Sequence, residues 1–210
     1  YVMLLVGMVV SSIVLGWLLS EFSQLRLIQV VQGAAAVTMI LNVVALWKQE
    51  VRDPSRTRGR AADAPGFMES WRELAQSGPW TRVLISVGLG TAAFSMQDIL
   101  LEPYGGEILH LSVGQTTALT GFLACGTLLG FVVASGALTS GFDPFRLAAL
   151  GAVAGLFAFP AVILSAHVES VQLFRAGTML IGFGSGLFSV GTLTAAMNMS
   201  TGANNGLALG

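Results

Sequence analysis

Long apolar runs separated by short polar segments dominate the sequence, and each run is a candidate membrane-spanning helix. Such a helix needs about 20 mostly apolar residues. Because the chain starts inside an apolar run, without a start methionine or a charged leader, we expect a fragment of a longer protein. A further run begins near Leu207. The complete candidate runs are Val2–Leu19, Leu27–Trp47, Trp80–Leu101, Val113–Leu138, Pro144–Ala166 and Gln172–Met197.

The composition is typical of a polytopic membrane protein. Hydrophobic residues make up 54% of the chain and charged residues 10%, whereas a soluble domain carries about 25% charged residues. The net charge of −1 gives no bulk attraction to nucleic acid. The single cysteine, Cys125, lies inside an apolar run and is most simply a packing residue.

The basic residues predict the orientation of the chain in the membrane, because cytoplasmic loops carry an excess of lysine and arginine. Segment 48–79 is therefore predicted to be cytoplasmic, with a short amphipathic helix at Phe67–Leu74 that anchors it to the membrane surface or docks a partner. The connections Ser20–Arg26, Glu102–Ser112 and His167–Val171 then lie on the outer side. The basic residues in or beside the cytoplasmic segment are Lys48, Arg52, Arg56, Arg58, Arg60, Arg72 and Arg82.

Glycine pairs with three residues between them occur in several predicted helices. They are Gly126 with Gly130, Gly151 with Gly155, and Gly182 with Gly186. Small residues at this spacing let helix backbones approach closely in membranes. We expect them to pack helices within the chain rather than to form a dimer. The run Gly182–Gly186 holds an extra glycine, which suggests a bending point.

The segment Gln97–Glu107 concentrates polar groups where a spanning helix meets water. Asp98 and Glu102 are four residues apart and share a helix face. An ionisable group at the membrane edge is costly to desolvate, so it is a functional candidate by default. Pro103 disfavours the helical conformation at the residue before it, and the glycine pair that follows loosens the chain. We therefore expect the helix to end near Leu101 in a bent, acidic cap.

The order of helices and loops matches the middle of a major facilitator superfamily protein. That fold joins two similar helical halves through a cytoplasmic loop. We therefore expect an all-α membrane protein with a major-facilitator-type helical bundle, in which the chain covers about helices 5 to 10 and the start of 11. Residues 1–47 would be the last two helices of the N-terminal bundle, 48–79 the inter-bundle loop, and 80–210 an incomplete C-terminal bundle.

The strings Gln97–Gly106 (QDILLEPYGG) and Leu111–Thr120 (LSVGQTTALT) closely resemble the PucC and LhaA family, the bacteriochlorophyll-delivery branch of that superfamily. The resemblance runs through the whole chain and is strongest over Ser95–Gly130. It implies a multi-pass protein of the bacterial inner (intracytoplasmic photosynthetic) membrane. Ser140 stands where the superfamily has an aspartate between its eighth and ninth helices, and only Arg146 remains of the basic pair. This departure weakens the case for ordinary alternating-access transport.

The sequence contains no catalytic constellation, so we expect that the protein is not an enzyme. Metal-binding cysteine pairs, the His-Glu-x-x-His motif and phosphate-binding loops are missing from it. If the pigment implied by the resemblance binds, its Mg²⁺ is a hard ion that prefers oxygen or imidazole donors. The candidates for binding pigment or a partner are Gln97, Asp98, Glu102, Tyr104, Glu107 and His110.

Each candidate also has a structural interpretation. Gln97 offers an amide oxygen near the membrane edge, whereas His110 is more simply a solvated loop residue. Asp98 and Glu102 orient a water ligand, pair with a basic residue of a partner, or form an ion-pair network with Arg175, which is predicted on the same outer side. Bacteriochlorophyll, held transiently, is the expected cofactor, and no metal ion is expected to be bound by the protein alone.

The resemblance leads to one principal hypothesis and leaves others open. The principal one is an assembly factor for bacterial light-harvesting antenna complexes, which delivers bacteriochlorophyll to antenna polypeptides or escorts them around the reaction centre. Its partners would be those polypeptides, the reaction-centre complex, pigment and membrane lipid, with no nucleic acid. The alternatives are a proton-coupled secondary transporter of a small or amphipathic molecule, using Asp98 or Glu102, and a permanent antenna–reaction-centre subunit.

Overall fold

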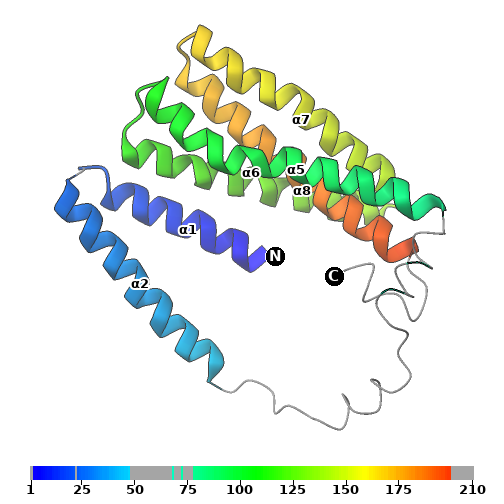
Figure 1. Cartoon of the computed structure of the whole chain (residues 1–210), viewed down its shortest axis with the longest axis horizontal. Helices are drawn as coiled ribbons and strands as arrows, with labels where there is room; N and C mark the ends of the chain where they lie inside the picture. Colours follow the sequence, from blue (N-terminus) through cyan, green and yellow to red (C-terminus); the bar gives the residue numbers. More distant parts are fainter. Residues whose placement is uncertain (1, 22, 48–67, 69–71, 73–77, 200–210) are drawn as a thin grey trace. The chain divides into compact units, whose positions relative to one another are not determined.

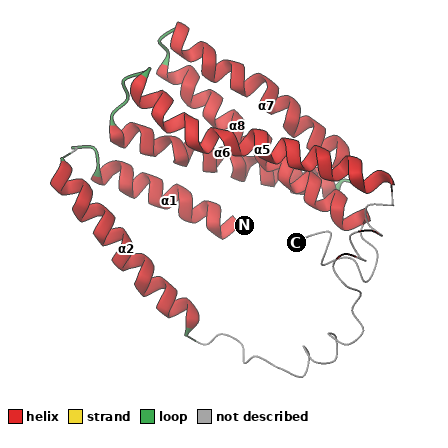
Figure 2. Ribbon diagram, in the orientation of Figure 1, coloured by secondary structure: helices red, strands yellow, loops and turns green. Residues whose placement is uncertain are grey.

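The computed structural model describes residues 2–21, 23–47, 68, 72 and 78–199, and the regular secondary structure within these ranges is entirely α-helical. The helices are α1 (Val2–Leu18), α2 (Gln24–Leu46), α5 (Gly78–Glu107), α6 (Val113–Thr139), α7 (Pro144–His167) and α8 (Val171–Met199), shown in Figures 1 and 2. Among the described residues, α2 and α5 to α8 are long and apolar enough to cross a membrane, and α1 is apolar but has only 17 residues. The prediction of an all-α membrane protein is confirmed.

The chain divides into two compact units. One holds Tyr1–Glu21 and Arg82–Gly210, and the other holds Phe22–Thr81. The predicted amphipathic helix at Phe67–Leu74 lies outside the described residues except for Met68 and Arg72, and the apolar start near Leu207 lies outside them altogether. The division into N-terminal and C-terminal bundles and the orientation in the membrane stay predictions.

Helix α8 forms the centre of the first unit, and its sequence shows why. Apolar residues recur on it every seventh position, and three small residues recur with the same period on a neighbouring face. A seven-residue repeat keeps one face of a helix turned towards its neighbours along its whole length. The apolar series is Phe174, Ile181, Phe188 and Ala195, and the small series is Gly177, Gly184 and Gly191; all are buried.

Glycines hold α6 and α7 against α8 at close range. A Cβ added at Gly130 of α6 would lie 2.6 Å from the carbonyl oxygen of Phe183, and one at Gly186 of α8 would lie 2.6 Å from that of Thr127. On the other side of α8, a Cβ at Gly184 would lie 2.7 Å from the carbonyl oxygen of Gly151 on α7. Packing within the chain is therefore the confirmed use of these glycines. Helix α8 runs unbroken through Gly182–Gly186, and the bending point expected there stays a prediction.

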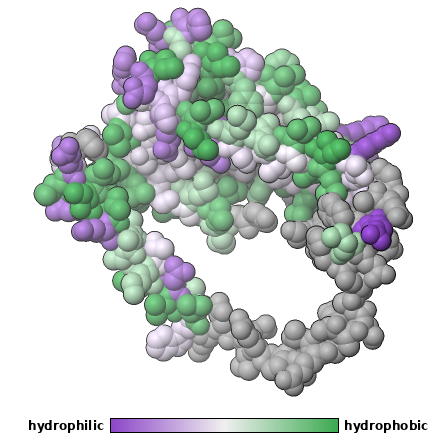
Figure 3. Space-filling model, viewed as in Figure 1, coloured by the Kyte–Doolittle hydropathy of each residue, from purple (hydrophilic) through white to green (hydrophobic). Residues whose placement is uncertain are grey.

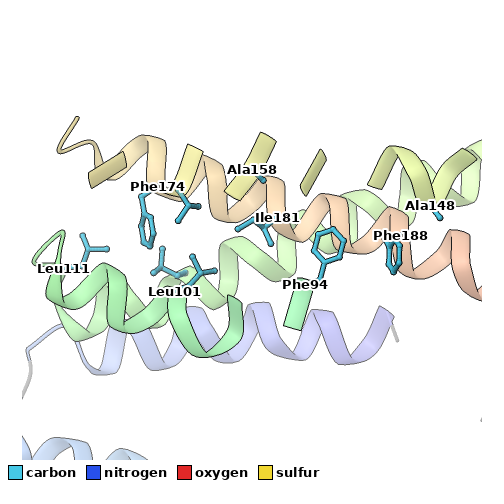
Figure 4. Close-up of a cluster of buried hydrophobic side chains, with 10 residues drawn as sticks. Phe94, Leu101, Leu111, Ala148, Ala158, Phe174, Ile181 and Phe188 are labelled. Carbon is cyan, nitrogen blue, oxygen red and sulfur yellow. The ribbon is translucent and has the colours of Figure 1, made fainter. Parts of the chain in front are cut away.

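Helix α5 is attached by large side chains instead of by close backbone approach. The rings of Phe94 on α5 and Phe188 on α8 lie 5.7 Å apart, and the rings of Tyr104 on α5 and Phe174 on α8 are stacked at 5.8 Å. Figure 4 shows the buried side chains of α8 directed towards Phe94 and Leu101 of α5. Large side chains between the backbones leave room for cavities on both sides of α5.

The prediction that the helix ends near Leu101 is wrong, because α5 continues through Pro103 to Glu107. A proline inside a helix costs about 3 kcal/mol, since it removes one backbone hydrogen bond. Tertiary packing outweighs this cost here. The hydroxyl of Tyr104 donates to the carbonyl oxygen of Ile163 at 3.2 Å, and Gly105 is buried against the side chains of α8 and α6. The predicted outer loop is therefore reduced to the residues after Glu107.

Short turns with defined caps join α6, α7 and α8. Ser112 and Gln115 form a capping box at the start of α6, and Asp143 caps the start of α7. Glu169, in the turn between α7 and α8, has a φ of 49°, in the left-handed region that favours glycine. Over the first unit, Figure 3 shows hydrophilic residues gathered near the helix ends, as expected for helices that cross an apolar layer.

Candidate functional site

The predicted polar segment lies along α5 and borders two separate cavities. Gln97 is buried, with 6% of its surface exposed, and it lines both of them. Asp98 and Glu102 line one cavity, and Tyr104 and Glu107 line the other. The shared helix face predicted for the two acids is confirmed. The segment is thus a polar strip between two cavities and not a cap at the end of a helix.

The larger cavity lies between α5, α7 and α8 and has a volume of about 700 Å³. We call it the lateral cavity. Its wall is apolar except where Gln97, Tyr104 and Glu107 contribute polar groups. A ligand site in a protein is typically a mostly apolar concavity of about 300–1,000 Å³ with a few polar groups that fix orientation. Its residues are Ala93, Met96, Gln97, Leu100, Leu101, Pro103, Tyr104, Glu107, Ile108, Phe159, Val162, Ile163 and Ile181.

The smaller cavity lies between α1, α5 and α6 and has a volume of about 270 Å³. We call it the acidic cavity. An oxygen of Glu102 accepts a hydrogen bond from the Thr120 hydroxyl at 3.1 Å, which joins α5 to α6. The side-chain nitrogen of Gln97 donates to Asp98 at 3.3 Å. Its residues are Met8, Gln97, Asp98, Leu101, Glu102, Leu119, Thr120 and Leu123.

Gln97 is the least satisfied polar group of the site. Its side-chain oxygen is buried and has no hydrogen-bond donor in the structure. A buried acceptor without a partner costs about 1–3 kcal/mol, so such groups are rare in folded proteins. The amide nitrogen already donates to Asp98, so the oxygen is the atom of this side chain that is available to accept a hydrogen bond or to bind a metal ion.

Two predicted residues lie apart from both cavities. His110 is exposed in the turn between α5 and α6, with a φ of 52°. The guanidinium carbon of Arg175 lies 5.8 Å from the centroid of the Phe122 ring. Within the described residues Arg175 forms no ion pair with Asp98 or Glu102, so the predicted network has no support from this structure. Among those residues, no group of His, Cys, Asp and Glu is arranged to hold a metal ion.

Several residues of the site were not among the candidates that the sequence offered. Thr120 is one of a series of threonines near the start of α6, and only the fold brings it to Glu102, 18 residues away. Ile163 and Phe159 come from α7 and complete the lateral cavity. A third cavity, of about 650 Å³, lies near the other end of α5 beside Arg82, and none of the predicted residues lines it.

Comparison with known protein families shows which family the chain belongs to. The family model described as PUCC protein matches residues 1–210, which is the whole chain. The chain belongs to the PUCC protein family. The sequence resemblance to PucC is thereby confirmed. No solved structure matches the chain.

Curated relatives of the chain come from Rhodovulum and Rhodobacter. Protein PucC of Rhodovulum sulfidophilum is 50% identical over 212 residues, which cover 100% of this chain and 47% of the relative. The uncharacterized protein in the puhA-bchM intergenic region of Rhodobacter capsulatus is 49% identical, covering 100% of this chain and 44% of the relative. The bacteriochlorophyll synthase 44.5 kDa chain of Rhodobacter capsulatus is 27% identical, covering 95% of this chain and 46% of the relative. The chain thus spans about half the length of the curated relatives it matches.

Proposed function

We propose that the chain is part of an assembly factor for bacterial light-harvesting antenna complexes, which delivers bacteriochlorophyll to antenna polypeptides or escorts them around the reaction centre. The observation that carries this proposal is the PUCC family match over residues 1–210. The similarity to a chain named for bacteriochlorophyll synthase adds support for a link to that pigment. The proposed location is the bacterial inner, photosynthetic membrane, with segment 48–79 in the cytoplasm. No catalytic step is part of the proposal.

The lateral cavity is the proposed place for the pigment. Bacteriochlorophyll is a large, flat, mostly apolar molecule with a central Mg²⁺, and this cavity has the volume and apolar wall that suit the edge or face of such a ring. The unpartnered amide oxygen of Gln97 is the proposed oxygen donor for the metal, because Mg²⁺ prefers oxygen ligands. Tyr104 and Glu107 would orient the polar edge of the ring.

A deletion in a phototrophic host tests the function of the full-length protein. The gene would be removed and replaced by wild-type or variant copies, and the membrane absorption of antenna complexes would be measured relative to that of reaction centres. We expect the deletion to lower the antenna band strongly while reaction centres persist. Normal antenna absorption in the deletion strain would refute the proposal.

The variant Gln97→Leu tests the cavity. The leucine removes an oxygen that has no donor and a single hydrogen bond, from the amide nitrogen to Asp98. Because one hydrogen bond contributes only about 0.5–3 kcal/mol, the fold should persist, and a loss of antenna absorption would report a lost contact and not unfolding. Gln172→Leu, at an exposed position of α8, is the matched control and should keep wild-type absorption. Equal absorption in both variants would remove Gln97 from the pigment site.

A proton-coupled secondary transporter is the second candidate, and one observation favours it. Asp98 and Glu102 lie in a membrane-spanning helix beside a cavity, and no basic side chain pairs with them among the described residues. Ionisable groups in such positions often carry protons. Reconstituted full-length protein that moves protons across a vesicle membrane, and stops doing so in Glu102→Gln, would favour this candidate over assembly.

A further inference from the structure

The acidic cavity brings together oxygen atoms that can only accept hydrogen bonds when the acids are ionised. Asp98 and Glu102 supply carboxylates, and the amide of Gln97 supplies an oxygen with no donor of its own. Gln97 is 6% exposed, so this oxygen cannot be satisfied by open solvent. The existing bonds, from Thr120 to Glu102 and from Gln97 to Asp98, each use only one acceptor position of a carboxylate. The cavity is therefore rich in acceptors and poor in donors.

The described part of the chain supplies no positive charge to balance these acids. Helix α1 contributes Met8 to the cavity, and α6 contributes Leu119, Thr120 and Leu123, all of them uncharged. Arg175 is placed over the Phe122 ring instead. A carboxylate at membrane depth is normally paired with a cation or a polar network, because desolvating an unpaired charge costs several kcal/mol. We therefore expect a positively charged group from outside the described residues to balance the two carboxylates.

The size and lining of the acidic cavity indicate which kind of cation fits it. A volume of about 270 Å³ exceeds the need of a bare ion, since one water occupies about 30 Å³ in the liquid. It is also smaller than the lateral cavity, which we assign to the pigment. Met8, Leu119 and Leu123 line it with apolar surface. Lysine and arginine bury an aliphatic stem along such surface and keep a charged end for acceptors.

We propose that the acidic cavity binds one long basic side chain, a lysine or an arginine, that comes from outside the described residues. Its stem lies along Met8 and the leucines of α6, and its charged end donates to Asp98 and Glu102, with the Gln97 oxygen as a further acceptor when no pigment occupies the lateral cavity. The base is supplied by another part of the full-length protein or by a bound membrane polypeptide. The inference rests on the two carboxylates of this cavity and shares only the Gln97 oxygen with the proposed pigment site.

A structure of the full-length protein tests the inference directly, determined once for the purified protein and once in a complex with antenna polypeptides. A lysine or arginine nitrogen within 4.0 Å of the carboxylates in the protein alone would assign the base to the same chain. Its appearance only in the complex would assign it to the polypeptide. A metal ion, a lipid tail or water alone in both structures would overturn the inference.

Charge removal gives an independent readout. Glu102→Gln leaves the proposed base without one partner, and we expect the equilibrium constant for folding, or for binding of the polypeptide, to fall at least tenfold. Glu169→Gln removes an exposed acid in the turn between α7 and α8 and should change the same constant less than about twofold. Equal effects of the two variants would overturn the inference. Absence of bound pigment would refute the pigment site in the lateral cavity and leave this result unaffected.

Discussion

The contact between α6 and α8 gives the sharpest prediction, because it depends on the absence of one carbon atom. Gly130→Ala adds a Cβ that would lie 2.6 Å from the carbonyl oxygen of Phe183, which is 0.8 Å less than the 3.4 Å at which ordinary contact begins. The same atom would lie 3.1 Å from the Cα of Gly186 and 3.2 Å from the nitrogen of Leu187. All of these are backbone atoms of α8, so no side chain can rotate away. The helices must move apart.

The cost of that movement follows from the loss of packing along the contact. A gap of 0.5–1 Å removes about a quarter to a half of the dispersion energy between the facing atoms. The buried cluster of Ala134, Leu147 and Leu187 lies beside this contact and would loosen with it. Overpacking a close-packed interior costs about 1–3 kcal/mol. A clash with rigid backbone belongs in the upper part of this range, which exceeds the gain of about 1 kcal/mol from replacing glycine by alanine in a helix.

Gly136→Ala is the matched control on the same helix. A Cβ at Gly136 would have no atom within 4 Å, so this variant should keep or slightly increase stability. The free energy of unfolding of the full-length protein would be measured by titration with a denaturing detergent. We expect Gly130→Ala to unfold at a lower detergent fraction than wild type and Gly136→Ala to unfold at the same or a higher one. Equal midpoints for the two variants would refute the close contact.

Three further variants test local features. Tyr104→Phe removes the hydrogen bond to Ile163 but keeps the ring, so the same titration should show a loss of about 0.5–1.5 kcal/mol, and no loss would show that the bond is absent. Thr120→Val removes the donor to Glu102 and should cost about 0.6 kcal/mol, the average for such bonds in membranes; a stabilised variant would argue against this bond. Glu169→Gly relieves a left-handed backbone conformation and should add about 1 kcal/mol, whereas a loss would mean that the side chain holds the turn.

Hydrophobic patterning was enough to predict the helices, because an apolar run of about 20 residues that crosses a membrane has few possible structures other than a helix. The predicted run Val113–Leu138 corresponds to α6, at Val113–Thr139, and Pro144–Ala166 corresponds to α7, at Pro144–His167. The role of the glycine pairs was also predictable from the sequence, since small residues at this spacing allow helices to pack closely. Hydrophobic patterning does not show which helix packs against each face of a given helix.

The end of α5 shows where local rules fail. Pro103 and the glycines after it are sequence signals that predict the end of a helix. In the fold, Gly105 lies against the side chains of Phe174, Leu111 and Leu119, so the missing side chain makes close packing possible and does not loosen the chain. A sequence shows which residues weaken a helix but not which contacts compensate for them.

The candidate site was predicted in part. The sequence pointed to Gln97, Asp98 and Glu102 because polar groups are rare in apolar runs. It did not reveal that Gln97 is buried between two cavities or that Thr120 binds Glu102, because both depend on contacts between helices. Pairing of the acids with Arg175 was inferred from predicted topology alone, and topology fixes the side of the membrane but not the face of a helix.

The most direct test of the central claim is the absorption spectrum of the full-length protein, purified in mild detergent from phototrophic membranes that lack antenna polypeptides. We expect a bacteriochlorophyll band in a fixed ratio to protein. The band should disappear in Gln97→Leu and persist in Gln172→Leu. A colourless wild-type protein that is folded and intact would contradict pigment binding in the lateral cavity.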